Sequence, residues 1–465
     1  MNFDDVIEKM SDEIIQKTQE IIRIRSVEGD PLPGKPFGQG IGEVIDYMLQ
    51  LGSSMGFKTK NLDGYAGYIE YGEGTDLIGI LAHLDVVPEG NGWTYPPYAA
   101  EIHDGKMYGR GSMDDKGPAM ASLYAMKAIK DSGIKLNKRV RLILGLDEES
   151  GWQCIEHYKK VEEIPSCAFT PDGDYPVIYA EKGIVNYKFS QKISQQDSPV
   201  KIISIKGGNR PNMVADFCEA VLAVNPDIFK DASDKINKLI DDSGFNINIH
   251  IEGYKIILES HGQSAHGSTP EIGINAISQL MTVIYKFMKM LNIKHEFIDF
   301  YGESISLEIY GDSLGCAVED EVSGKLTFNI GLIDANEDYM ETIANIRYPV
   351  TYEESDIYDR IIKAVSKYGI QVDKIEHQKP LYVPKDNPLV QKLMKVYKEF
   401  TGDTTSEPLA IGGGTYARAI DNAVAFGAAF PGELELAHQK DEYIKIDSLI
   451  KSTKIYARAI YELAK

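Results

Sequence analysis

Six candidate metal ligands occur in one order along this chain, and most of them follow a short apolar run or lie at a sharp turn. They are His83, Asp114, Glu148, Glu149, Asp172 and His438. Histidine and carboxylates are the usual ligands of catalytic zinc, which keeps an open position for water. Two metals roughly 3.5–4 Å apart need about five such ligands, and a further carboxylate must move the proton of that water. The six residues are enough to supply the five ligands and the carboxylate that moves the proton.

Three apolar runs read as buried strands that end at these residues. The runs are 77–82, 140–146 and 167–169. His83 and Asp85 follow the first run, Glu148 and Glu149 the second, and Asp172 the third. In open α/β sheets, ligands collect outside the carboxyl ends of the strands, so these side chains are expected to form one polar site.

The remaining candidates fit the same arrangement. Asp114 precedes a helical stretch over 119–130, and Pro118 suits the first turn of that helix. Glu148 and Glu149 can divide the work of base and ligand, because successive side chains at a strand end point in different directions. Asp85 is placed to accept the second ring N–H of His83.

Each motif alone also has an ordinary explanation. A single His-x-Asp is usually a surface coincidence. Asp-Asp-Lys-Gly is more often a turn with a helix cap, and an isolated Glu-Glu is usually a solvated face. The metal hypothesis depends on all of them occurring together at the ends of predicted strands.

The segments around these residues resemble the dinuclear-zinc family of aminoacylases, carboxypeptidases and dipeptidases. The matching stretches are His-Leu-Asp-Val-Val-Pro from 83, Gly-Arg-Gly-Ser-Met-Asp-Asp-Lys-Gly from 109, Gly-Leu-Asp-Glu-Glu-Ser-Gly-Trp from 145, Phe-Thr-Pro-Asp-Gly from 169 and Phe-Pro-Gly-Glu-Leu-Glu-Leu-Ala-His-Gln from 430. The resemblance covers nearly the whole chain and looks closest to the PepV-like dipeptidases.

This resemblance implies a role for each residue. His83 and Asp172 would bind one metal, Glu149 and His438 the other, and Asp114 would bridge both. Glu148 would be the general base and acid, and the Asp114–Asp115 peptide bond would be cis. Asp at position 172 looks more like the aminopeptidase and dipeptidase side of the family than the glutamate carboxypeptidase side.

The spacing of the ligands predicts an inserted domain, because over two hundred residues separate Asp172 from His438. We expect a catalytic domain of residues 1–183 and 381–465, an α/β zinc-peptidase-like fold on a mixed, mostly parallel sheet. Residues 184–380 would form an inserted α+β lid of ferredoxin-like type. Its expected elements are strands from Val200 and from Tyr254 and helices over 213–222, 273–290 and 357–368.

A weak internal repeat points to two related subdomains in the lid. Residues 200–222 and 254–280 both read as strand, Gly-rich turn and helix, although two such units can be similar by coincidence. Related half-lids would fit the PepV-like proteins, whose extended lid resembles a lid plus the partner lid that dimeric relatives supply. On that basis we expect a monomer.

The resemblance also implies substrate contacts in and beyond the lid. His266 matches the lid histidine that would reach the developing oxyanion, and Asn212 matches a second polar contact. Arg347 matches the residue that would bind the substrate's carboxylate, as a bidentate guanidinium can. Gly413 and Gly414 would let the backbone approach the substrate, whereas a phosphate loop would need a lysine that this run lacks.

The composition limits the partners and the cell compartment that can be expected. The 465 residues carry a formal net charge of −21, which disfavours nucleic acid or an anionic membrane as partner. The N-terminus has no secretory hydrophobic segment, and no apolar run reaches membrane-spanning length. The four cysteines show no metal or disulfide spacing and are expected to be reduced, which favours the cytoplasm.

The function expected from these features is hydrolysis of dipeptides with free termini at two zinc ions, with manganese or cobalt also compatible with the ligands. The alternative is an N-acyl amino acid deacylase or succinyl-diaminopimelate desuccinylase on the same scaffold, which would share every ligand. A non-enzymatic metal carrier is a distant third, because a carrier has no need of a carboxylate base such as Glu148.

Overall fold

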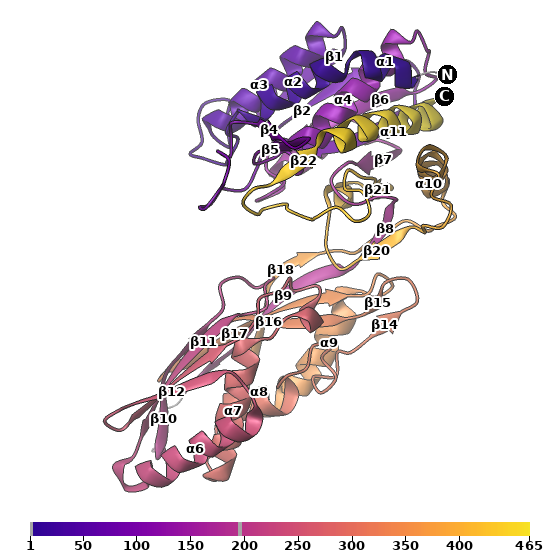
Figure 1. The fold of residues 1–465 in the computed structure, drawn as a ribbon. Helices are drawn as coiled ribbons and strands as arrows, with labels where there is room; N and C mark the ends of the chain where they lie inside the picture. The colour runs from indigo at the N-terminus through magenta and orange to yellow at the C-terminus, as the bar shows by residue number, and fades with distance from the viewer. Residues whose placement is uncertain (1–2, 194–197) are drawn as a thin grey trace. The chain divides into compact units, whose positions relative to one another are not determined.

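A computed structural model describes residues 3–193 and 198–465 (Figure 1). They divide into two compact units. The first consists of residues 1–180, 381–410 and 414–465, and the second of residues 181–380 and 411–413. Residues 1–2 and 194–197, which belong to the predicted catalytic and lid domains, lie outside the described residues. The catalytic and lid roles of the two units stay predictions.

The first unit is built on a mixed sheet, of nine strands within the described residues, in the order β1-β2-β6-β3-β7-β21-β8-β19, with β20 paired to β8. The four central strands β6, β3, β7 and β21 are parallel, whereas β1, β2 and β8 pair antiparallel. The strands are β1 (Lys58–Leu62), β2 (Ala66–Tyr71), β3 (Leu77–His83), β6 (Arg139–Gly145), β7 (Cys167–Thr170), β8 (Ile178–Glu181), β19 (Leu381–Tyr382), β20 (Leu409–Ile411) and β21 (Ala423–Ala425).

Helices cover both faces of this sheet. Every residue of β3 is buried, as expected of a strand covered on both sides. The alanine-rich α4 packs along α11, and α3 packs against the face of β2 that carries Ile69 (Figure 1). The helices are α1 (Phe3–Lys9), α2 (Ser11–Ile22), α3 (Gln39–Ser54), α4 (Lys116–Asp131), α5 (Gln153–Val161), α10 (Pro388–Thr401) and α11 (Ile446–Ala464). The predicted helix over 119–130 is α4, with Pro118 in its first turn.

A small antiparallel sheet, in the order β22-β5-β4, completes the first unit. Its strands are β4 (Glu101–His103), β5 (Lys106–Tyr108) and β22 (Tyr443–Lys445). Because β22 leads into α11 and β5 leads into the loop before α4, this sheet holds two distant parts of the chain side by side.

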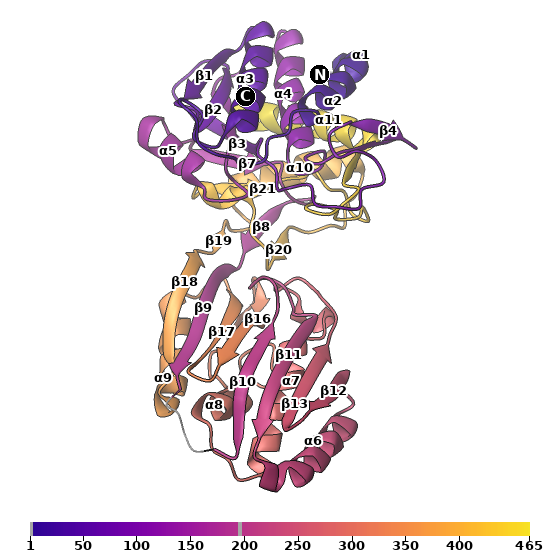
Figure 2. The same ribbon diagram turned by 90° about the vertical axis from the view of Figure 1, so that its left-hand side faces the viewer.

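The second unit is an antiparallel sheet with helices on one face (Figure 2). Its strand order is β12-β13-β11-β10-β16-β17-β9-β18. The strands are β9 (Gly183–Lys192), β10 (Val200–Gly207), β11 (Phe217–Val224), β12 (Ile247–Glu252), β13 (Lys255–His261), β16 (Thr327–Asn336), β17 (Tyr339–Tyr348) and β18 (Gln371–Gln378). The helices are α6 (Phe229–Ser243), α7 (Ala276–Met290), α8 (Glu296–Ser304) and α9 (Glu354–Val365). The predicted fold class, a mixed α/β sheet with a separate antiparallel sheet, is confirmed.

One expected lid element is wrong. The helix predicted over 213–222 is absent, and the residues from Phe217 onward belong to the strand β11, which lies between β10 and β13. Alternate residues Cys218, Ala220 and Leu222 are buried, and this period of two is the pattern of a strand with one covered face. The first proposed repeat unit is therefore strand–turn–strand, while two related subdomains stay a prediction.

Two simpler expectations can be compared directly with the structure. Within 3–193 and 198–465, every helix is too short or too polar to cross a membrane. All four cysteines are unpaired, and Cys154, Cys218 and Cys316 are buried while Cys167 is half-buried.

Candidate metal centre

His83 is the last residue of β3 and is fully buried. Its ring nitrogen Nε2 lies 2.8 Å from Oδ1 of Asp114. The other ring nitrogen, Nδ1, lies 3.0 Å from the backbone carbonyl oxygen of Asp85 and 3.6 Å from its carboxylate. The main-chain oxygen of Asp85 is thus nearer to Nδ1 than its carboxylate is, and the role of that carboxylate as acceptor of the second ring N–H stays a prediction.

The Asp85 carboxylate holds the next strand end instead. Its two oxygens accept the backbone N–H groups of Glu148 at 3.1 Å and Glu149 at 3.0 Å. Asp147 then accepts the N–H groups of Gln153 and Cys154 at the start of α5. These bonds fix the turn that carries the two glutamates after β6.

Asp114 lies on the loop before α4, and the Asp114–Asp115 peptide bond is cis. Asp115 is fully buried and accepts the backbone N–H of His83 at 3.1 Å, which links this loop to the end of β3. Gly117 is required by close approach, because a Cβ there would collide with the carbonyl oxygen of Ser112. The Asp-Asp-Lys-Gly motif therefore does more than cap a helix.

His438 approaches from the segment before β22, far along the chain. Its Nε2 lies 3.1 Å from Oδ2 of Asp114 and 2.9 Å from Oε2 of Glu149. Asp114 therefore presents one carboxylate oxygen to each of the two histidines. Ligand atoms of His83, Asp114 and Glu149 all lie within 4.8 Å of one another.

The charges of these groups act on one another because the groups are buried close together. Burial and the charge of Asp114 raise the pKa of Asp172 to about 7. Burial also raises the pKa of Glu148 well above its usual range, with Asp172 and Glu149 adding to the shift and His83 opposing it. Asp172 and Glu148 thus belong to the same cluster of carboxyls.

The histidines balance part of this negative charge. Hydrogen bonds to Asp114 and Glu149 raise the pKa of His438 to about 11. Burial disfavours a charged His83, but Asp114 and Asp85 outweigh it and raise its pKa. Burial likewise disfavours ionised Asp114, yet both histidines lower its pKa. The cluster stabilises positive charge at these positions.

This donor set fits divalent metals. Nitrogen and oxygen ligands of one tetrahedral zinc lie roughly 3.3 Å apart, given bonds of about 2.0–2.1 Å, and the histidine–carboxylate distances of 2.8–3.1 Å are close to that. A carboxylate with one oxygen toward each histidine has the form of a bridging ligand. Metal cations can take the place of the ring protons in the charge balance.

The other candidates gather in the second unit. The backbone N–H of Gly267, next to His266, donates to the carbonyl oxygen of Asn212 at 2.7 Å. The charge of Arg347 and desolvation lower the pKa of His266 to about 4, with desolvation the larger effect. Arg347 is buried and donates to Asn345 at 2.8 Å and to the carbonyl oxygen of Gly412 at 3.2 Å.

The glycine run 412–414 is divided between the units, since Gly413 belongs to the second and Gly414 to the first. A Cβ on Gly412 would come within 2.8 Å of Cβ of Ser268, so close packing requires glycine there. The second unit thus places His266, Asn212, Arg347 and the start of this run near one another.

Sequence reasoning missed several residues that support the centre. Asp115, Asp147 and Glu442 are buried carboxyls that hold backbone N–H groups of the ligand loops. Asp115 stood beside a predicted ligand, and Glu442 follows His438 by four residues. The sequence shows only that a carboxylate stands near a predicted ligand. The backbone N–H groups that each carboxylate accepts can be identified only from the structure.

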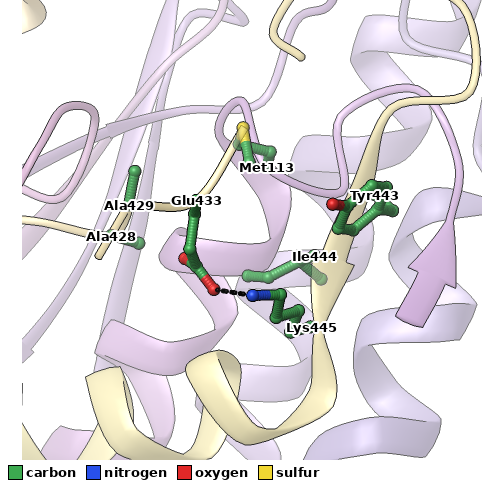
Figure 3. Close-up of a pocket in the computed structure, with 7 residues that line it drawn as sticks. All are labelled: Met113, Ala428, Ala429, Glu433, Tyr443, Ile444 and Lys445. Carbon is green, nitrogen blue, oxygen red and sulfur yellow. Dashed lines mark ion pairs between the residues drawn. The ribbon is translucent and has the colours of Figure 1, made fainter. Parts of the chain in front are cut away.

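A small pocket, partly open to solvent, adjoins Met113, the residue before Asp114 (Figure 3). Its lining residues are Met113, Ala428, Ala429, Glu433, Tyr443, Ile444 and Lys445. Glu433 pairs with Lys445 at 3.2 Å and also accepts from Ser448 and from the N–H of Phe430. Its charge is used to hold the C-terminal segment together.

Residues 79–462 match the family model described as peptidase family M20/M25/M40. The chain belongs to this peptidase family. An M20/M25/M40 protein depends on metal, and the centre described above supplies a His/Asp/Glu set for it. The predicted membership in the metallopeptidase family is confirmed.

Curated relatives from the family match over nearly their whole length. The chain is 43% identical to a putative dipeptidase of Bacillus subtilis, YtjP, over all of both chains. It is 36% identical to a putative dipeptidase of Staphylococcus haemolyticus, with 98% of each chain covered. Among solved structures, human carnosine dipeptidase 1 has a TM-score of 0.57 at 15% identity, covering 99% of both chains. The dipeptidase Dug1p of Saccharomyces cerevisiae also has a TM-score of 0.57, at 14% identity, covering 99% of this chain and 98% of its own. These two likenesses concern the fold.

Proposed function

We propose that this M20/M25/M40 protein is a metal-dependent dipeptidase that hydrolyses the peptide bond of short peptides with free termini. The observation that carries the proposal is Asp114, whose two carboxylate oxygens lie 2.8 and 3.1 Å from the imidazoles of His83 and His438. The full-length relatives named as dipeptidases support it, and they do not favour the deacylase alternative.

The metals would be two zinc ions, with manganese or cobalt accepted by the same ligands. In this proposal His83 and Asp172 would hold one ion, Glu149 and His438 would hold the other, and Asp114 would serve both. When bound, the pair would lower the pKa of a water molecule and polarise the peptide carbonyl.

Glu148 is proposed as the group that moves the proton. Asp85 fixes the backbone of Glu148, which leaves the Glu148 side chain to accept a proton from the attacking water and to pass it to the leaving amine. Burial raises the pKa of Glu148, which favours its protonated form, and bound cations would oppose part of this shift.

We assign substrate contacts to the second unit and the glycine run. His266 is neutral near pH 7, and its Nδ1 lies 2.6 Å from Oγ of Ser268 and 3.3 Å from the Ser268 backbone N–H. In the tautomer in which Nδ1 accepts from Ser268, the Nε2–H group can donate to an oxyanion. Arg347 would bind the substrate's carboxylate, with Asn212, Gly413 and Gly414 as neighbouring polar and backbone contacts. We expect the protein to act as a monomer in the cytoplasm.

Metal-stripped protein reconstituted with zinc, manganese or cobalt tests the function against a panel of free dipeptides and N-acetyl and N-succinyl amino acids. We expect metal-dependent cleavage of dipeptides, and in Glu148→Gln a loss of at least about 10²-fold in kcat with metal still bound. Cleavage of N-acyl compounds alone would overturn the dipeptidase assignment, and normal turnover by Glu148→Gln would remove Glu148 from the mechanism.

A further inference from the structure

Glu442 is a buried carboxylate that joins the loops of two proposed metal ligands. Its side chain is 0% exposed. Oε1 accepts the backbone N–H of Met113 at 2.9 Å and of Asp114 at 3.3 Å, and Oε2 accepts Nη1 of Arg110 at 2.6 Å. One side chain from the C-terminal segment therefore holds the loop that carries Asp114.

The surroundings of Glu442 keep that carboxylate in place. Arg110 is 2% exposed, lies over the ring of Trp93 and is itself on the Asp114 loop. The carbonyl oxygen of Glu442 accepts the N–H of Gly109 at 2.9 Å, so both the main chain and the side chain of Glu442 bind this loop. Figure 3 shows Met113 beside the strand that begins at Tyr443.

The same short stretch of chain carries His438. Asp441, next to Glu442, accepts the backbone N–H of Thr94 at 2.6 Å and its hydroxyl at 2.9 Å, which anchors the end of the His438 loop. Hydrogen bonds of Glu442 and Asp441 therefore hold the loops of His438 and Asp114 next to each other. His438 and Asp114 are 324 positions apart in the sequence.

We propose that Glu442 is a positioning residue that sets the Asp114 carboxylate against His438 and so maintains the affinity of the centre for both metals. The inference rests on the proposed metal-dependent function. Glu442 touches neither substrate nor metal and acts through the backbone of Asp114. A carboxylate is required because three N–H groups converge on it, and the NH₂ of a glutamine would face at least one of those donors.

Zinc titration of metal-stripped protein by calorimetry tests this proposal without relying on turnover. Glu442→Gln should weaken zinc binding about 10–100-fold, the loss usual for residues that orient metal ligands. Because Asp114 contacts both ions in the proposal, the affinity of both sites should fall. The visible absorption of the cobalt(II) form should change as well.

The matched control is Glu70→Gln, which removes the carboxylate of another buried pair, Glu70–Arg141, at the same distance of 2.6 Å. That pair lies between β2 and β6 and contacts no proposed ligand. The control should lower the melting temperature and leave zinc affinity within about 2-fold, because no ligand loop depends on it.

Unchanged zinc affinity and cobalt absorption in folded Glu442→Gln would overturn the proposal. If that variant does not fold, Glu442→Asp tests the proposal instead. The aspartate side chain is shorter by one methylene, so its carboxylate cannot reach all three donors. Affinity equal to that of the unaltered protein would then overturn it. An unaltered protein that binds two metals but cleaves no dipeptide would contradict the proposed function and leave the role of Glu442 standing.

Discussion

Three aspartates of this centre have different tasks because they face different groups. Asp114 faces two imidazoles, Asp85 faces the N–H groups of a turn, and Asp115 faces the N–H of His83. A carboxylate that faces N–H groups organises backbone, whereas one that faces imidazoles is available to a cation. Residue type alone cannot separate these tasks, because all three residues are buried or half-buried aspartates beside the same histidine.

Arg347 allows a test of substrate binding at the level of one side chain. Its Nε donates to Asn345 and Nη1 donates to Gly412, which fixes the plane of the guanidinium. Arg347→Lys keeps the charge but loses the paired geometry that suits a carboxylate. We expect KM for dipeptides to rise about 10–100-fold with a smaller change in kcat.

Steady-state kinetics on one dipeptide would measure both constants, with Arg360→Lys on the exposed surface of α9 as control. An unaltered KM in Arg347→Lys would contradict the role of Arg347 in holding the carboxylate.

At the level of elements, the strand ends that carry the candidate ligands can be predicted from the sequence, whereas the hydrogen bonds between distant loops cannot. The runs before His83, Glu148 and Asp172 are continuous and apolar, so both the strands and the polar edge could be inferred. Within 213–222, the alternation that marks a strand covers only the residues from Phe217 onward, which pair on both sides as part of β11. Glu442 shows the same limit, because its partners come from a distant segment.

The pairing of β2 and β6 should make stability depend on pH. Glu70 and Arg141 are buried directly opposite each other in this pair. Burial would raise the pKa of Glu70, but the hydrogen bonds and charges of Arg141 and Lys58 outweigh it and lower the pKa below its usual value. The stabilisation is therefore complete above the unfolded-state pKa of about 4.3 and is lost as pH falls through the folded-state pKa.

Glu70→Gln should accordingly lower the free energy of unfolding by about 2–3 kcal/mol at pH 7, and the difference from the unaltered protein should shrink below about pH 4. Urea unfolding followed by circular dichroism at pH 7 and pH 3.5 measures it. Glu73→Gln, on the exposed loop after β2, is the control. A difference that is the same at both pH values would contradict the ion-pair explanation.

At the scale of the whole molecule, metal removal should destabilise the protein more as pH rises. The folded-state pKa of Asp172 is about 7, whereas an unfolded aspartate titrates near 3.9. The folded, metal-free protein thus binds more protons between about pH 4 and 7, and its stability falls as pH rises through that range. Cations bound to the carboxylates would compensate their negative charge and so prevent this loss of stability at higher pH.

Differential scanning calorimetry of stripped and zinc-loaded protein at pH 5 and pH 7.5 checks this. Saturating zinc should raise Tm by about 5 °C or more at pH 7.5, because a ligand at 100 times its Kd contributes about 2.7 kcal/mol. The increase should be smaller at pH 5. An increase that is equal or larger at pH 5 would be the contrary result.

The order of the chain has a consequence for biosynthesis. β21 (Ala423–Ala425) lies between β7 and β8 in the first sheet, and His438 follows it. A growing chain that has already made β3, β6 and β7 still lacks the strand that continues their parallel array, and it lacks His438. During synthesis the ribosome must therefore deliver the whole second unit before the first can close. The metal centre can therefore be assembled only after residue 438 has been made, when this later segment joins strands that were made long before.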